Sequence, residues 1–207
     1  MGMKATWPIV GVVITAAIAV NCGKGGGGNP LSPGAVEPTQ ASLQAPYQNR
    51  SDVSAIRAGF SATANAPWGV EHWGLTLYTV GDGRRFVAAA AGTVGSLRLW
   101  QNGAFWQVNF DLNLADGSQL TYGFFTGSGD RADGDAQLAA MVVVNAQRVA
   151  AGDPVGSLRT PNADARLEFT VMVNNKGVCP ERYLATDVKD AMVGLLRLAY
   201  PGANMCY

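Results

Sequence analysis

The chain contains a single histidine, His72, in the segment VEHWGLTL at residues 70–77. A neutral imidazole nitrogen can bind a metal, and an imidazole can move protons near neutral pH. A Ser-His-Asp hydrolase would have to recruit this one histidine, and no nucleophile-elbow pattern surrounds a serine. A lone histidine beside Trp73 is more often an ordinary packed or half-exposed side chain, and the surrounding elements have to support any other interpretation.

Two further groups of side chains could do chemistry. Asp130, Asp133 and Asp135 could suggest calcium binding, but their spacing does not match a calcium-binding loop, which favours a solvated loop. Four tryptophans could stack on sugar rings, although aromatic side chains in a small β domain more often fill the core or its rim. These tryptophans are Trp68, Trp73, Trp100 and Trp106.

The composition indicates a globular, β-rich chain. Apolar residues make up 48% and charged residues 14% of the 207 residues, which is enough for a core and unlike a disordered chain. Fifteen Lys and Arg balance fifteen Asp and Glu, and nucleic-acid-binding proteins normally carry a basic surplus, so we expect no nucleic-acid partner. The 26 glycines punctuate short apolar runs, which favours strands joined by many turns.

Alternating apolar and polar residues predict the strands. The clearest hairpin is FWQVNFDLNLADGSQLTYGFF at residues 105–125, where the alternation breaks at Asp116-Gly117 and then resumes. The other predicted elements are a hairpin turn at Asp82-Gly83, a buried strand within AAMVVVNAQRV, a tight turn at Gly152-Asp153 and a period-two strand over residues 165–175.

One segment predicts a helix, at residues 183–200. Thr186 or Asp187 can cap its start, and Pro201-Gly202 ends it. The apolar residues that recur at helical spacing are Leu184, Val188, Met192, Leu195 and Ala199.

The first 46 residues predict an export signal, a lipid-attachment site and a flexible linker. Lys4, the apolar run TWPIVGVVITAAIAV and then Cys22 resemble a bacterial lipoprotein signal, and the run is too short to span a bilayer comfortably. We expect a signal peptide over residues 1–21, lipid attachment at Cys22 and a Gly/Pro-rich linker over residues 22–46. Asn21 stands where Gly, Ala or Ser is usual, which leaves a plain secretory signal or a short membrane anchor as the alternative.

This resemblance also implies a location. In such lipoproteins an Asp after the cysteine is associated with inner-membrane retention, and this chain has Gly23 there. We therefore expect an exported lipoprotein at the periplasmic face of the outer membrane, with the cell surface and the inner membrane as the less favoured locations. If Cys22 carries lipid, Cys179 and Cys206 are left as an even pair, which in an oxidising compartment indicates a disulfide. Two free buried thiols are the alternative.

The order of the elements resembles the lysostaphin-type zinc endopeptidases of the M23 family, which cut peptidoglycan cross-bridges. HWGLTL stands where the family has H-x-G-x-D, and ARLEFTV where it has H-L-H-F-E-V. FVAAAAGTVGSL, ADGSQLTYGFF, QRVAAGDPVGSL and GVCPERYL match the family's remaining motifs in order. The resemblance implies a mainly β, M23-like duplicated-hybrid-motif barrel or sandwich over residues 47–207, with one C-terminal helix.

The resemblance also assigns roles to five positions, and this chain changes four of them. The family's zinc is held by the His and Asp of H-x-G-x-D and the second His of H-x-H, positions that are His72, Thr76 and Glu168 here. The first His of H-x-H and a hairpin His serve the attacking water and the oxyanion, and they correspond to Arg166 and Phe124. A threonine is a poor zinc ligand, a guanidinium opposes a dication, and a phenyl ring donates no hydrogen bond to an oxyanion.

These changes favour a domain that acts by binding, with no catalytic residue and no metal expected. We expect a lipid-anchored, non-catalytic scaffold whose partner is peptidoglycan or an envelope protein, and in which His72, Arg166 and Glu168 form a structural cluster. One alternative is an active zinc endopeptidase with His72, Glu168 and Asp111 as ligands. Another is a structural subunit of an envelope assembly.

The predicted lipid anchor can be tested at Cys22. In its native host the mature protein should partition into detergent and carry the added mass of acyl chains, because membrane attachment would depend on the modified thiol. The Cys22→Ala variant should be released into the soluble fraction. An unmodified, soluble mature form that begins at another residue would contradict the prediction.

Overall fold

The structure is a computed structural model that describes residues 42–207. The predicted signal peptide, Cys22 and the linker up to residue 41 lie outside the described residues. Within residues 42–207 no helix combines the length and the apolar character that crossing a bilayer requires.

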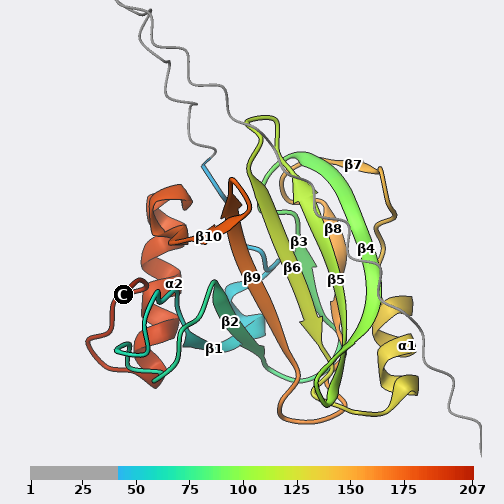
Figure 1. The fold of residues 1–207 in the computed structure, drawn as a ribbon, viewed down its shortest axis with the longest axis horizontal. Helices are drawn as coiled ribbons and strands as arrows, with labels where there is room; N and C mark the ends of the chain where they lie inside the picture. Colours follow the sequence, from blue (N-terminus) through green and yellow to red (C-terminus); the bar gives the residue numbers. More distant parts are fainter. Residues whose placement is uncertain (1–41) are drawn as a thin grey trace, which may run out of the picture. The chain divides into compact units, whose positions relative to one another are not determined.

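A large antiparallel sheet carries most of the domain (Figure 1). Its strands run in the order β1-β2-β9-β6-β5-β4-β7, and β10 pairs with the far end of β9. Their bounds are β1 Val53–Ala58, β2 Leu75–Thr79, β4 Gly92–Asn102, β5 Phe105–Asn113, β6 Gln119–Phe125, β7 Arg148–Val149, β9 Arg166–Val173 and β10 Lys176–Val178.

A smaller sheet and two helices complete the domain. Strands β3 (Arg84–Val87) and β8 (Pro154–Leu158) pair only with each other. Helix α1 (Arg131–Ala139) packs on β4 and β5, and helix α2 (Thr186–Ala199) packs on β1, so the helices flank the two ends of the sheet (Figure 1). The short 3-10 turns are η1 (Arg50–Asp52) and η2 (Pro180–Tyr183).

The core forms on one face of the large sheet because its strands alternate. In β9 the buried residues are Leu167, Phe169 and Val171, as its period-two sequence predicted. Phe124 of β6 meets Phe86 of β3 edge to face, which packs the small sheet onto this core. Burial of each such large apolar side chain contributes about 1.5–3 kcal/mol.

Tyr122 joins the core to the chain that follows β3. Its hydroxyl accepts a hydrogen bond from the Ala89 N–H at 2.7 Å and donates one to the Val87 carbonyl at 3.2 Å. Complete burial raises the pKa of this phenol far above its ordinary value, so it stays a neutral donor. The bond fixes the small residues Ala88 and Ala89 closely against the sheet.

The mainly β fold class is confirmed, but the expectation of a single helix is wrong. Helix α1 occupies the segment that the acidic sequence predicted as a solvated loop. The Asp130 carboxylate caps it by accepting from the Ala132 N–H at 2.9 Å, and Arg131 and Asp135 form an exposed ion pair one turn apart. Gly134 permits close packing, since a Cβ there would lie 2.9 Å from the Cβ of Trp106.

Two strand predictions are also wrong. Asp82-Gly83 lies in a turn, but β2 and β3 on either side of it belong to different sheets and do not form a hairpin. The three valines after α1 are not a buried strand, because Val142 and Val144 are 61% and 63% exposed and only Val143 is buried; the strand in this run is confined to Arg148–Val149. Apolar runs of this length do not specify what they pack against.

The C-terminal helix is confirmed, with different ends. Neither Thr186 nor Asp187 caps it: the N-cap residue is Ala185, which makes no side-chain cap. Leu184 is buried but precedes the helix, and Ala199 is exposed. The residues that α2 buries are Met192, Leu195 and Leu196.

The packed domain begins before residue 47, so the linker prediction ran too far. Leu43 is 1% exposed and forms a bridge with Leu184, and its N–H donates to the Tyr183 carbonyl. The Gln44 N–H donates to the Ala89 carbonyl. Residues 43–46 therefore belong to the fold.

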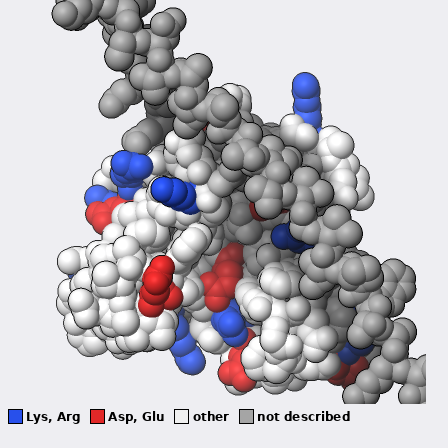
Figure 2. Space-filling model, viewed as in Figure 1, with Lys and Arg blue, Asp and Glu red and all other residues white. Residues whose placement is uncertain are grey.

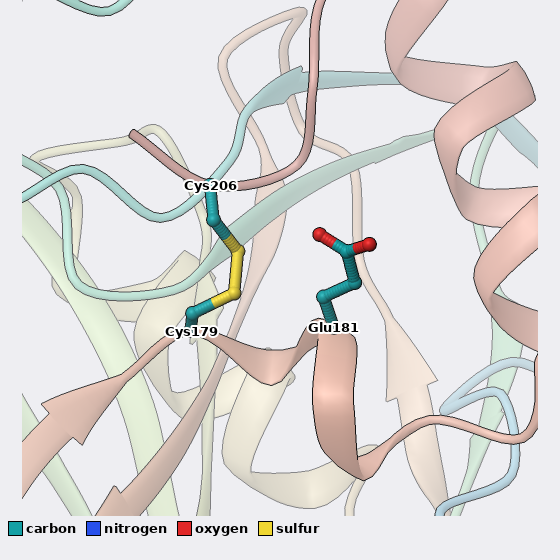
Figure 3. Close-up of side chains that lie close together, drawn as sticks. All are labelled: Cys179, Glu181 and Cys206. Carbon is teal, nitrogen blue, oxygen red and sulfur yellow. A yellow bond between two sulfur atoms is a disulfide. The ribbon is translucent and has the colours of Figure 1, made fainter.

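The Cys179–Cys206 disulfide is confirmed (Figure 3). It joins the exit of β10 to the C-terminal segment, across 27 residues that include all of α2. Cys206 also forms a backbone bridge with Phe60, so the bond ties three segments together.

Removal of this bond should weaken the domain. For a loop of this length the chain-entropy model gives a loss of roughly 3–4 kcal/mol in the free energy of unfolding for the Cys179→Ser/Cys206→Ser variant. Urea denaturation measures the loss, and hydrogen exchange should show it concentrated in α2 and residues 203–207. Two freely alkylated thiols in the native, unreduced protein would refute the bond.

Candidate functional site

Four of the five positions expected at the cleft meet beside β9. Thr76 of β2 pairs across the sheet with Glu168 of β9, and His72 lies just before β2, fixed by its backbone bridge to Ser61. Atoms Nε2 of His72, Oγ1 of Thr76 and Oε2 of Glu168 are 2.9–3.0 Å from one another. Arg166 reaches Glu168 along the same face of β9, as period two requires.

The hydrogen bonds of His72 indicate which nitrogens carry protons. Nδ1 lies 3.0 Å from the carbonyl oxygens of both Gly59 and Gly74, which only accept, so Nδ1 donates. The Gly74 N–H lies farther from Nδ1, at 3.4 Å, and is the weaker contact. Nε2 faces the Glu168 carboxylate at 2.9 Å, so the doubly protonated imidazolium satisfies both ring nitrogens.

The surroundings favour this charged form. Burial by itself lowers the pKa of His72, but the hydrogen bond and negative charge of Glu168, helped by the Gly74 and Gly59 carbonyls, outweigh burial. The net result is a pKa above the ordinary value of a histidine.

Glu168 is the centre of the cluster. Its Oε2 accepts from His72 and from the Thr76 hydroxyl, and its Oε1 accepts from Nε of Arg166 at 2.9 Å. The Arg166 guanidinium also lies over the Phe125 ring, with its carbon 4.5 Å from the ring centroid. One carboxylate is therefore shared by two cations and a hydroxyl.

Phe124 does not lie in the cleft, contrary to the motif-based expectation. It pairs with Leu167, is completely buried, and faces the core on the opposite side of the sheet from Glu168. The cleft positions on β6 are Gly123, opposite Glu168, and Phe125, opposite Arg166. The parity of β6 could have shown this, because Leu120 and Tyr122 share the face of Phe124.

Asp111 does not join the cluster either. It pairs with Thr121, whose hydroxyl donates to its carboxylate at 2.8 Å. Strand β5 lies two strands from β9, so Asp111 is roughly 10 Å or more from Glu168. The expectation that it could serve as a third ligand with His72 is wrong.

Polar side chains continue the face of Glu168 across β6 and β5, where Gln107 is buried and the others are at least partly exposed. Nε2 of Gln107 donates to Asn109 at 2.9 Å, and Nε2 of Gln119 donates to Asn113 at 2.7 Å. These residues share the face of Glu168 in the strand register. Figure 2 shows acidic side chains in a hollow over the middle of the sheet, with a basic side chain beside them. In the sequence these residues stand out only as the polar half of the alternating hairpin.

The donor set does not fit the catalytic zinc site that the resemblance implies. Ligand atoms on a tetrahedral zinc ion lie about 3.3 Å apart, because each is about 2.0–2.1 Å from the metal. The three atoms here lie at hydrogen-bond distances, one belongs to a neutral hydroxyl, and the carboxylate is paired with Arg166.

A second group of potential metal ligands cannot bind a metal while its two cysteines are joined in a disulfide. Within residues 42–207, Cys179, Glu181 and Cys206 are the one set of three His, Cys, Asp or Glu side chains close enough to share an ion. Both sulfurs belong to the disulfide, as Figure 3 shows, so neither is a thiolate ligand.

Comparisons with known proteins agree with this architecture. No protein-family model and no curated protein matches the sequence. The structure of Csd3 from Helicobacter pylori, from an orthorhombic crystal, aligns with a TM-score of 0.51 and 20% identity over 75% of this chain and 39% of that one. At this identity the likeness shows the fold alone, and the domain has an M23-like fold, as its motifs predicted.

Two peptidases align less closely. The antimicrobial peptidase lysostaphin from Staphylococcus simulans gives a TM-score of 0.47 at 17% identity, over 80% of this chain and 57% of that one. A zinc-containing peptidase from Vibrio cholerae gives 0.43 at 18% identity, over 66% and 39%. The chain spans less than two thirds of the length of each of these proteins.

The charge of His72 can be followed directly, because the chain has one histidine. Its ring C–H signals in NMR should titrate with a midpoint above 6.5, and Glu168→Gln should lower that midpoint. Since folding raises this pKa, the stabilisation is fully present below the unfolded value of about 6.5 and is lost as pH rises through the folded pKa. A wild-type midpoint below 6.5 would contradict the ion pair.

Proposed function

We propose that this chain is an exported, lipid-anchored protein whose M23-like domain binds in the cell envelope without cutting. Its partner is peptidoglycan or an envelope protein. The observation that carries the proposal is the cluster at the expected metal-ligand positions, where Glu168 is paired with both His72 and Arg166. Export and the lipid anchor rest on the sequence pattern around Cys22.

The cluster supports a structural role for His72. A metal ion would need the lone pair of His72 Nε2 and the Glu168 carboxylate as ligands. Here Nε2 carries the imidazolium proton, and the carboxylate is paired with the Arg166 guanidinium. Arg166 cannot give up its charge, so a dication at this place would meet a fixed cation. Removing one partner from such a partly buried pair leaves an uncompensated charge, which favours retention of the cluster.

Within residues 42–207, the two β6 positions opposite Glu168 and Arg166 supply no donor for hydrolysis. Gly123 and Phe125 of β6 offer no side-chain hydrogen bond to a developing oxyanion. The partly exposed side chains of Asn109, Asp111 and Thr121 lie on the same face of the sheet as the cluster and can bind a polar chain through hydrogen bonds. This combination supports binding in place of cleavage.

An active zinc endopeptidase is the competing candidate. The observation in its favour is that Nδ1 of His72 donates to backbone carbonyls, which is how many metal-bound histidines are oriented. It would require Glu168 to leave Arg166 and a further ligand to be found. A metal measurement therefore separates the two candidates.

The purified full chain should bind intact peptidoglycan sacculi and release no peptide from them, with far less than one zinc per chain. The Thr76→Asp/Arg166→His/Glu168→His variant is the matched control, because it installs the donor types of the M23 family at positions that the structure brings together. It should bind zinc close to one per chain, since three charged or imidazole ligands and the loss of the guanidinium complete the site.

Stoichiometric zinc in the unaltered chain, with chelator-sensitive peptide release that His72→Ala abolishes, would establish the active enzyme and exclude this proposal. If the chain neither sediments with sacculi nor releases peptide, peptidoglycan is excluded and the envelope-protein partner is left. Co-purification from the native envelope then identifies that partner.

A further inference from the structure

Trp73 stands in the wall of a hollow outside the polar cleft. The indole is 54% exposed, more than any other aromatic side chain of residues 42–207. The hollow has a volume of about 330 Å³, within the size range of small-molecule sites. Its lining residues are Phe60, Ala62, Glu71, Trp73, Lys176 and Gly177, and we refer to it as the Trp73 hollow.

The exposed indole is held in one position. Its Nε1–H donates to the Glu71 carboxylate at 3.0 Å. The Trp73 side chain also packs against Gly177 of β10. A Cβ on Gly177 would lie 3.0 Å from the Trp73 Cβ and 3.3 Å from the indole ring. The glycine therefore lets the indole lie against the β9–β10 hairpin, and a fixed aromatic side chain is left facing solvent.

The opposite wall is equally constrained. Phe60 forms a backbone bridge with Cys206, and the disulfide joins Cys206 to Cys179 directly after β10. Both walls of the hollow are thus connected through one covalent bond. A ligand that enters a preformed hollow loses little free energy to ordering the protein.

The polar groups at the rim restrict the ligand class. Glu71 supplies an acceptor and Lys176 supplies donors, and no ion pair within 4.0 Å joins them among the salt bridges of residues 42–207. The two charges cancel, so the lining favours a neutral ligand that both donates and accepts hydrogen bonds. The ligand must also place an apolar face on the indole.

We propose that the Trp73 hollow binds a neutral saccharide ring of the N-acetylhexosamine class. A pyranose ring carries C–H groups on one face, which stack on the indole, and hydroxyl and amide groups at its edge, which reach Glu71 and Lys176. A ligand with a single charge would pair with one of these two side chains and be repelled by the other. The proposal rests on the proposed function only for the source of the saccharide, the glycan strand of peptidoglycan.

The test is a titration of the purified full chain, in mild detergent, with a soluble β-1,4-linked N-acetylglucosamine tetramer, followed by tryptophan fluorescence. We expect saturable binding with a Kd of about 1 mM, the affinity of a small site with one stacking ring. Trp73→Ala should weaken binding about tenfold or more, and Trp73→Phe should recover much of it. Lys176→Ala, which keeps the indole, should weaken binding about threefold.

Trp100→Ala is the matched control, because Trp100 is also exposed but lies on β4 away from the hollow. It should bind the tetramer as the unaltered chain does. The inference is overturned if the tetramer does not bind at 10 mM, on the order of ten times the expected Kd. It is also overturned if Trp73→Ala binds normally, or if tetra-alanine binds at the hollow and the saccharide does not. Sacculus binding that survives Trp73→Ala would overturn this inference and leave the proposed function standing.

Discussion

The register of β9 between β2 and β6 is the constraint on which the site depends. Leu75 and Leu77 of β2 meet Phe169 and Leu167 of β9 on the core face, which leaves Thr76 and Glu168 together on the other face. A slip of one residue would bury the carboxylate and expose the phenylalanine, so burial of the core also fixes the polar cluster. The geometry of the cleft is therefore specified by apolar residues that never touch it.

Within that frame the electrostatics centre on Glu168. A carboxylate that balances an imidazolium and a guanidinium is stable in a partly buried position, and each cation loses its partner if Glu168 is changed. The same arrangement is poorly suited to holding a dication. At the positions where the motif resemblance implies metal ligands, the charges form an ion-pair cluster, so the fold by itself does not assign the chemistry of this domain.

The disulfide extends the rigid framework to the surface beyond the cleft. It anchors the residues after α2 to the exit of β10 and to Phe60, and the Trp73 hollow forms between these segments. The hollow and the polar cleft lie on either side of the chain at His72 and Trp73. The two surfaces differ in character: one is polar, and the other presents a fixed aromatic ring.

The sequence by itself determined the local features. Period-two alternation gave the β5–β6 hairpin and the buried face of β9, and the cysteine count indicated the disulfide. The order of the motifs, through their resemblance to the M23 family, indicated that His72, Thr76 and Glu168 lie close together. Tertiary structure decided the rest. Helix α1 forms because a capped acidic segment packs on Trp106, which its weak apolar periodicity does not reveal. The turn at Asp82-Gly83 fixes a chain reversal but not the sheet that each flanking strand joins.

Phe124 shows most directly why sequence motifs did not locate every residue of the site. Motif spacing counts residues along the chain, whereas the face of a strand is set by pairing with its neighbours, and a difference of one residue places a side chain in the core.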